Sequence, residues 1–336
     1  MSNINIYDIA KMTGVSIATV SRVLNGSEKV SEKTRLKVME AIKQSGYTPN
    51  VFARGLGMNT MQTVGIMVPS IADLYMSSAV AFLEDALHRI GYECILSCSG
   101  FKAEDKASHL QMLLTKRVDA MILVGSTYAG SGDESHNTDY IRKAAGEVPV
   151  FLINGLVEGD NIYCSATYDY QAVYDVTERI IRSGRKAPLF LTDSRSYSAV
   201  RKKQGFKDAM KAAGLKTPAK FSIHTTNDVT VVREFLHKRG EIDFDSVIAT
   251  DDGMAIGAIK YAKDKGLRIP EDVCIVGYNN SALCCCTDPE LASIDNHVEA
   301  VCHSTVDRLQ RVLSGEQDVE RLVMLDCSLV ERETLV

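Results

Sequence analysis

The residues with the clearest chemical signature lie between Ser16 and Thr34. Most carry small side chains that donate or accept hydrogen bonds, and the group comprises Ser16, Ile17, Ala18, Thr19, Ser21, Arg22, Asn25, Ser31 and Thr34. An arginine can donate two parallel hydrogen bonds to O6 and N7 of guanine, and small apolar side chains pack against thymine methyl groups. Hydroxyl and amide groups suit phosphate oxygens, which fix register without reading the bases. Together these residue types indicate recognition of duplex DNA.

Three short helices are predicted to position these side chains. Asn5 can cap the first, whose apolar residues recur at helical spacing until Gly14 ends it. Ser16 caps the second, whose apolar side chains Val20, Val23 and Leu24 face inward and which stops at Asn25-Gly26. Ser31 caps the third, from about residue 32 to 44, which stops at Ser45-Gly46. A helix, a tight turn and a second helix with one polar face predict a helix-turn-helix whose second helix enters the major groove.

Charge is distributed unevenly along the chain. The 336 residues include 38 basic and 43 acidic side chains, and this net charge of −5 by itself argues against a nucleic-acid partner. Residues 1–60, however, carry eight basic and four acidic side chains, so the net charge is +4 there and −9 in the remainder. A basic N-terminal segment on an acidic body is typical of a modular DNA-binding protein.

From residue 63 the pattern changes to short apolar runs separated by helical stretches. The seven predicted strands are TVGIMV (63–68), ECILSC (93–98), AMILVG (120–125), VPVFLIN (148–154), APLFLT (187–192), SVIAT (246–250) and VCIVGY (273–278). Alternating strands and helices predict an α/β fold with parallel sheets buried on both faces. Ligands bind outside the C-terminal ends of such strands, so the polar residues that follow them are candidate site residues.

Composition excludes several other classes of protein. No apolar run approaches the roughly 18 residues of a membrane span, and the N-terminus lacks a secretory signal pattern, so we expect a cytoplasmic protein without membrane contact. The nine cysteines are an odd number and favour free thiols. The run Cys284, Cys285 and Cys286 has neither a CxxC partner nor a histidine at ligand spacing, so we assign it no metal and no role.

Sequence motifs of enzymes are also missing. The chain contains no GxGxxG, GxxxxGK[ST], GxSxG or HExxH pattern. Asp251 and Asp252 are adjacent, and adjacent carboxylates cannot easily flank a substrate from two sides. We therefore interpret Asp252 as a turn residue and Asp251 as an acceptor for hydroxyl groups. We predict no catalytic residue and no cofactor.

The segments IYDIAKMTGVSIATVSRVLNG, VSEKTRLKVMEAIKQSGYTPN and VFARGLG resemble the head piece of the lactose-repressor (LacI/GalR) family, in the style of its catabolite-control members. The resemblance continues through KRVDAMILVG, SVIATDDGMAIGAIKYAKDKGLRIPEDVCIVGYNN and LVERE, and so covers essentially the whole chain. It implies a homodimer or tetramer on a near-palindromic operator. It also implies a hinge helix from Asn50 to about Met58 that contacts the minor groove through Asn50, Ala53 and Leu56, with Leu56 as a wedge between base pairs. The alternative for Leu56 is an ordinary linker leucine.

The resemblance further implies a domain order. A three-helix head piece (1–49) and a hinge with its linker (50–62) precede two Rossmann-like lobes of the periplasmic-binding-protein type. The N-terminal lobe is expected to comprise 63–166 and 292–320, and the C-terminal lobe 167–291 and 321–336. The family's effector positions correspond to Asp73, Tyr75, Met76, Ser126, Asn154, Lys202, Asp251 and Asn279. For each position taken singly, the alternative is a solvated loop residue.

Lys202 departs from the family pattern. Sugar-binding members usually have an arginine there, and Arg201 is one residue out of register. A lysine donates as a point charge and cannot make the planar fork to two sugar hydroxyls. A pentose, a hexose, and a phosphorylated, acidic or nucleoside-like effector all stay open.

These observations predict a ligand-responsive, sequence-specific DNA-binding regulator, with repression favoured over activation. It is expected to act on the nucleoid, and an effector could either release or promote DNA binding. One alternative is a sugar-binding protein outside transcription, which would need a signal peptide and would lack residues 1–60. Another is a sugar-processing enzyme with an appended DNA-binding segment.

Overall fold

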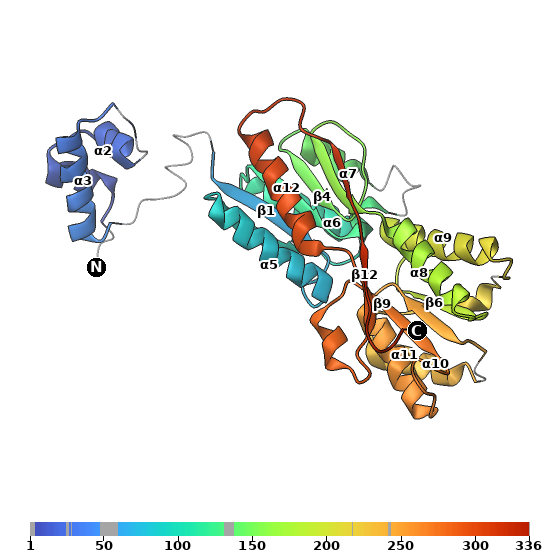
Figure 1. Cartoon of the computed structure of the whole chain (residues 1–336). Coiled ribbons are helices and arrows are strands. Elements are labelled where there is room, and N and C mark those ends of the chain that lie inside the picture. Colours follow the sequence, from blue (N-terminus) through green and yellow to red (C-terminus); the bar gives the residue numbers. More distant parts are fainter. Residues whose placement is uncertain are drawn as a thin grey trace. The chain divides into compact units, whose positions relative to one another are not determined.

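The computed structural model describes residues 4–24, 27, 29–47, 60–130, 138–216, 218–240 and 243–335. It divides into two compact units, one formed by residues 1–63 with 117–119 and one by the rest of the chain. In its described part, the first unit contains the helices α1 (Ile6–Thr13), α2 (Ile17–Leu24) and α3 (Glu32–Ser45). The second unit contains two sheets with their helices, coloured from light blue to red in Figure 1.

Local capping explains where the helices of the first unit begin and end. The Asn5 side chain accepts hydrogen bonds from the backbone N–H of Tyr7 and Asp8, and the Asp8 carboxylate accepts from the Asn5 N–H at 2.9 Å. This reciprocal capping box satisfies donors that the first turn leaves free. Gly14 ends α1 with a φ of 65°, and Gly46 ends α3 with a φ of 67°. The predicted caps and glycine stops of α1 and α3 are confirmed.

One small hydrophobic core holds the three helices together. Ile9 of α1, Val20 and Val23 of α2, and Val38 of α3 are buried against one another. The inward apolar face predicted for α2 is therefore confirmed. Its predicted stop, Asn25-Gly26, and the predicted hinge, 50–58, lie outside the described residues.

The first sheet of the body has the strand order β11-β5-β4-β3-β1-β2. Its strands are β1 (Thr63–Val68), β2 (Glu93–Cys98), β3 (Ala120–Val124), β4 (Val150–Ile153), β5 (Ile162–Thr167) and β11 (Leu322–Leu325). The pairs β1–β3, β3–β4, β4–β5 and β5–β11 are parallel. The accompanying helices are α5 (Leu74–Arg89), α6 (Ala103–Thr115), η1 (Ser126–Ala129), α7 (Asp139–Ala145) and α12 (Val298–Leu313).

The second sheet has the order β12-β10-β9-β8-β6-β7. Its strands are β6 (Pro188–Thr192), β7 (Ser222–His224), β8 (Ser246–Ala249), β9 (Cys274–Tyr278), β10 (Ala292–Asp295) and β12 (Ser328–Val330). Only β12 runs antiparallel to its neighbour β10 among the described pairings. The accompanying helices are α8 (Asp169–Arg182), α9 (Tyr197–Ala212), η3 (Ala219–Phe221), α10 (Val229–Lys238), α11 (Asp252–Asp264) and η4 (Ala282–Cys286).

Helices cover both faces of the second sheet. Leu236 of α10 and Ile259 of α11 belong to one buried cluster, and Val176 of α8 and Phe206 of α9 belong to another that also contains Val276 of β9. In the first lobe, α5 and α12 pack together over one face of the sheet. Each lobe is thus a sheet between helices, and the predicted α/β class with two Rossmann-like lobes is confirmed.

The chain passes between the lobes after β5, after β10 and after β11. All seven predicted strands are present, but two predicted lobe boundaries are wrong. Residues 292–295 form β10 and pair with β9 of the second sheet, although we expected them in the N-terminal lobe. Residues 322–325 form β11 and pair with β5 of the first sheet, although we expected them in the C-terminal lobe. The lobe to which each strand belongs is decided by the strand with which it pairs. The sequence of a four-residue strand contains little information about that pairing.

Candidate functional site

The first candidate site is the outer face of α2. Ser16, Ile17, Ala18 and Arg22 are exposed, while Val20 and Val23 on the opposite face are buried. Among the described residues, the Arg22 guanidinium has no hydrogen-bond or ion-pair partner. An arginine that is exposed and unengaged on a short helix is available for the edge of a base pair.

Two pairs of hydroxyl groups lie at the starts of α2 and α3. The Ser16 and Thr19 hydroxyls are 2.9 Å apart, and Ser16 Oγ also accepts from the Thr19 N–H at 3.1 Å. Ser31 and Thr34 repeat the arrangement, with their hydroxyls 2.9 Å apart. Each pair caps a helix whose N-terminus favours an anion such as phosphate. Ser21 is half-buried on α2, and the predicted contacts Asn25, Asn50, Ala53 and Leu56 lie outside the described residues.

The second candidate site is a cleft of about 770 Å³ between the two lobes of the body. All eight predicted effector positions line it: Asp73, Tyr75, Met76, Ser126, Asn154, Lys202, Asp251 and Asn279. Most of them follow the C-terminal ends of strands or begin the next helix, as the parallel-sheet rule requires. The two lobes meet there through Ser126 Oγ, which donates to Ser196 Oγ at 2.8 Å.

Asp251 accepts two hydrogen bonds on the second-lobe side of the cleft. Its side chain caps α11 by accepting from the Gly253 N–H at 2.9 Å, and it accepts from Asn279 Nδ2 at 2.8 Å. The pKa of Asp251 is raised to about 7, mainly by burial; the carboxylates of Asp73, Asp252 and Asp193 add to the rise, and the hydrogen bond from Gly253 opposes it. The carboxyl group therefore exchanges a proton near neutral pH.

Asp252 differs from our interpretation as a turn residue. It is buried in the first turn of α11 and accepts from the Ser281 N–H at 2.7 Å and from Ser293 Oγ at 2.6 Å. These bonds tie α11 to the ends of β9 and β10. Asp252 is a structural residue behind the cleft because its carboxylate is already occupied.

Lys202 does not extend freely into the cleft. Its ammonium nitrogen lies 3.3 Å from the centre of the Tyr278 ring and donates to the Thr250 carbonyl at 3.4 Å. The Tyr278 hydroxyl donates to Asp169, which also accepts from the Thr167 hydroxyl. The lysine is therefore anchored to the end of β9 and, through Tyr278, to the crossover after β5.

Several residues that line the cleft were missed by the sequence analysis. They are Asp193, Ser194, Ser196 and Ser198 after β6, Asn227 and Asp228 after β7, and Phe101 after β2. The strands β2 and β6 were predicted, so the rule that polar residues follow strand ends could have identified Asp193 and its serines. β7 has three residues and no apolar run of its own to reveal it.

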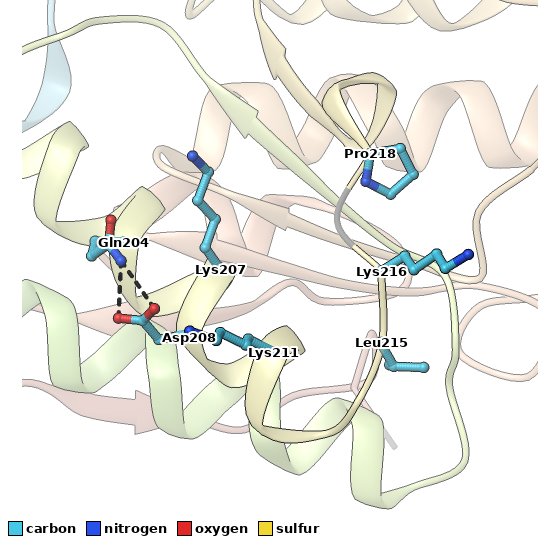
Figure 2. Close-up of a pocket in the computed structure, with 7 residues that line it drawn as sticks. All are labelled: Gln204, Lys207, Asp208, Lys211, Leu215, Lys216 and Pro218. Carbon is cyan, nitrogen blue, oxygen red and sulfur yellow. Dashed lines mark hydrogen bonds between the residues drawn. The ribbon is translucent and has the colours of Figure 1, made fainter.

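A groove on the outer side of α9 is a weaker candidate (Figure 2). It is lined by Gln204, Lys207, Asp208, Lys211, Leu215, Lys216 and Pro218. The Asp208 carboxylate is occupied by Gln204 Nε2 and the Tyr170 hydroxyl. The lysine amino groups do not converge on one point in Figure 2. No predicted site residue lies in this groove.

The described ranges contain neither a candidate metal site nor a helix that could span a membrane. No group of three or more histidine, cysteine, aspartate or glutamate side chains there could hold a metal ion. No described helix is both long and apolar enough to cross a bilayer.

All nine cysteines are free; Cys285 and Cys286 are exposed in η4, and Cys284 is buried. Cys98 is exposed as well.

A helix-turn-helix unit and a two-lobed body with a polar cleft define a class of protein that couples DNA contact to ligand contact. Residues 5–50 match the family described as bacterial regulatory proteins, lacI family, and residues 177–335 match a periplasmic binding protein-like domain. An HTH-type transcriptional regulator of Lachnoclostridium phytofermentans is 46% identical over 98% of this chain and 99% of its own. The catabolite control protein A of Priestia megaterium is 35% identical over 87% of each chain.

Solved structures show the same fold. A lac repressor dimer bound to operator and the anti-inducer ONPF superposes with a TM-score of 0.87 at 24% identity, over the full length of both chains. The complex of the transcriptional regulator CelR with cellobiose gives a TM-score of 0.70 at 25% identity, covering 98% of this chain and 99% of that one. This chain belongs to the lacI family of bacterial regulatory proteins, and it is a transcriptional regulator.

Proposed function

We propose that this regulator is a repressor that binds a near-palindromic operator as a homodimer. Its operator affinity changes when a small polar molecule enters the cleft. The observation that carries the proposal is that all eight effector positions inferred from the sequence line one cleft. Ser198 Oγ and Asn154 Oδ1, which line the same cleft, are buried without a hydrogen-bond partner in the described structure. Buried polar groups are normally satisfied, so these two atoms favour a polar ligand there.

Repression follows from the location of the bound protein. A dimer seated on promoter DNA blocks access by polymerase, and the chain acts in the cytoplasm where that DNA lies. We propose no catalytic role, because Asp251 already accepts two hydrogen bonds and Asp252 is buried in a structural network. The relatives named above are regulators as well.

The test begins with selection of binding sites from random DNA by the full-length protein, with and without a panel of sugars and sugar derivatives. We expect an inverted repeat, and a slope of log K against log salt of about −5 to −9 if six to ten phosphates are neutralised per dimer. A slope near −1, or tight binding by a monomer, would contradict the DNA-binding assignment.

The cleft is tested separately with Asp251→Ala and Asn279→Ala. Both should abolish the response to the active metabolite and preserve operator binding, because the two functions occupy different units. Asp175→Ala is the matched control, since Asp175 is exposed on α8 and does not line the cleft. Loss of operator binding with normal metabolite affinity in the cleft variants would refute the assignment.

A further inference from the structure

The cleft carries more negative than positive side chains. Among the described residues that line it are four aspartates, Asp73, Asp193, Asp228 and Asp251, but only one basic residue, Lys202. Phosphorylated and acidic ligands would meet repulsion from these carboxylates. The strength of this repulsion depends on how far the protein already compensates the four negative charges.

Three of the four carboxylates are partly compensated by helix ends. Asp73 caps α5, Asp228 caps α10 and Asp251 caps α11, each accepting from backbone N–H groups of the first turn. A helix N-terminus supplies only about half a positive charge. Asp193 follows β6, is exposed, and receives no hydrogen bond or ion pair from the described residues. Its full negative charge faces the cleft.

Lys202 compensates less than its charge suggests. It lies close enough to lower the pKa of Asp73, but it forms no ion pair with a carboxylate of the described residues. Its ammonium is directed to the Tyr278 ring and the Thr250 carbonyl. With the helix ends counted, the cleft keeps a negative charge of roughly one to two units.

The carboxylates also repel one another. Burial is the main cause of the raised pKa of Asp251 and Asp73, and Asp193 adds to the rise at both. A ligand that brought a positive charge between Asp193 and Asp251 would relieve this repulsion. A neutral hydroxyl group would donate a hydrogen bond but leave the charge in place.

Two unpaired polar groups in the same cleft are suited to hydroxyl groups of a ligand. Ser198 is 3% exposed and its hydroxyl has no partner in the described structure. It lies one turn before Lys202 on α9 and lines the cleft. Asn154 Oδ1, across the cleft, is a free acceptor that needs a donor. The site thus combines uncompensated negative charge with unpaired groups suited to hydroxyls.

We propose that the effector is a polyhydroxylated molecule bearing a protonated amino group, such as an amino sugar, with the ammonium held by Asp193 and Asp251. The proposal rests on the proposed function and names the ligand class of that same cleft. Asp193 is then the residue that selects charge. Asn154 and Ser198 bind the rest of the molecule.

Matched ligands that differ in one group test the proposal. Calorimetry at pH 7 with the full-length protein would compare glucosamine, galactosamine and mannosamine with their neutral parent hexoses and with the 6-phosphates of those hexoses. At least one aminated sugar should bind about tenfold or more tightly than its parent, and the 6-phosphates should bind more weakly than the parents. Asp193→Asn should reduce the preference for the amine to less than about threefold. Asp175→Asn, which removes the same charge from an exposed position on α8, should leave the preference unchanged.

Equal or tighter binding of a neutral parent, tight binding of a 6-phosphate, or no binding of any aminated sugar would overturn the inference. Failure of the proposed function has a different signature. If a neutral hexose binds and alters operator affinity, the function stands and the charge preference is wrong. If an aminated sugar binds with the predicted preference but operator affinity does not change, the ligand class stands and the regulatory role is wrong.

Discussion

The Lys202 ammonium packs on the face of the Tyr278 ring, with Nζ 3.3 Å from the ring centre. Both residues are buried, and the Tyr278 hydroxyl donates to Asp169 at the start of α8. The contact therefore joins α9 and β9 to the crossover between the lobes. The lysine side chain is thereby satisfied without a ligand.

A double-mutant cycle should detect this contact. The change in unfolding free energy of Lys202→Met alone contains two opposing contributions, the loss of the ring contact and the removal of a buried charge. Only the coupling energy with Tyr278→Leu isolates the contact. We expect a coupling of about 1–2 kcal/mol in the free energy of unfolding, as for a desolvated cation–π pair. Tyr278→Phe keeps the ring and is the control background, in which Lys202→Met should cost as much as in the wild type. A coupling indistinguishable from zero would show that the ring does not stabilise the ammonium.

The hydrogen bond from Tyr278 to Asp169 makes a separate prediction. Tyr278→Phe leaves the buried Asp169 carboxylate with the Thr167 hydroxyl as its remaining side-chain donor in the described structure. The body should lose about 1–3 kcal/mol of unfolding free energy, measured by urea denaturation. Tyr170→Phe removes a hydroxyl that donates to the half-buried Asp208, which keeps the Gln204 side chain as a donor, and should cost less than about 0.5 kcal/mol. Equal losses of unfolding free energy in Tyr278→Phe and Tyr170→Phe would mean that the buried hydrogen bond stabilises the body no more than the bond from Tyr170 to Asp208.

Asp251 should make the stability of the body depend on pH. Its pKa is about 7 in the folded protein against an ordinary value of 3.8. Between these values the folded state binds more protons than the unfolded state, so Asp251 lowers stability progressively as the pH rises from about 4 to 7. Asp251→Asn keeps a helix-capping side chain and removes the titration. Relative to wild type, its unfolding free energy should rise by about 1–3 kcal/mol between pH 5 and pH 8.

Urea denaturation at the two pH values, followed by circular dichroism, measures this difference. Asp175→Asn on the exposed side of α8 is the control for the charge change. A relative stability of Asp251→Asn that falls from pH 5 to pH 8 would contradict the raised pKa.

On the DNA-binding unit, Arg22 and the lysines of α3 should have different effects. Arg22→Ala should cost about 1–3 kcal/mol per half-site and flatten the preference for one guanine. Lys33→Ala and Lys37→Ala remove exposed charges on α3, so they should weaken binding to all sequences alike. Each should also make the slope of log K against log salt shallower by about one. Competition binding against single-base operator variants measures both quantities. If Arg22→Ala reduced the affinity for all operator variants equally, the arginine would contact phosphate and not a base.

Local sequence patterns determined much of this architecture. The helix caps Asn5 and Ser31 and the glycine stops at 14 and 46 act within one turn of chain, so the residues themselves specify them. The predicted strands are continuous apolar runs, and burial on both faces of a parallel sheet demands such runs. The rule that sites follow strand ends, together with the family resemblance, then located the eight cleft positions.

Other features depended on contacts between distant segments. β5 was missed because it contains Ser165 and Thr167, polar residues that are buried only because Thr305, Arg308 and Asp169 supply partners. β10 and β11 were placed in the wrong lobes because four residues can pair with either sheet, and only the fold selects the partner. The position of the Lys202 ammonium against Tyr278 was likewise not predictable. The conformation of a flexible side chain depends on the space that the packing of distant segments leaves open. The residues next to it in sequence do not determine that conformation.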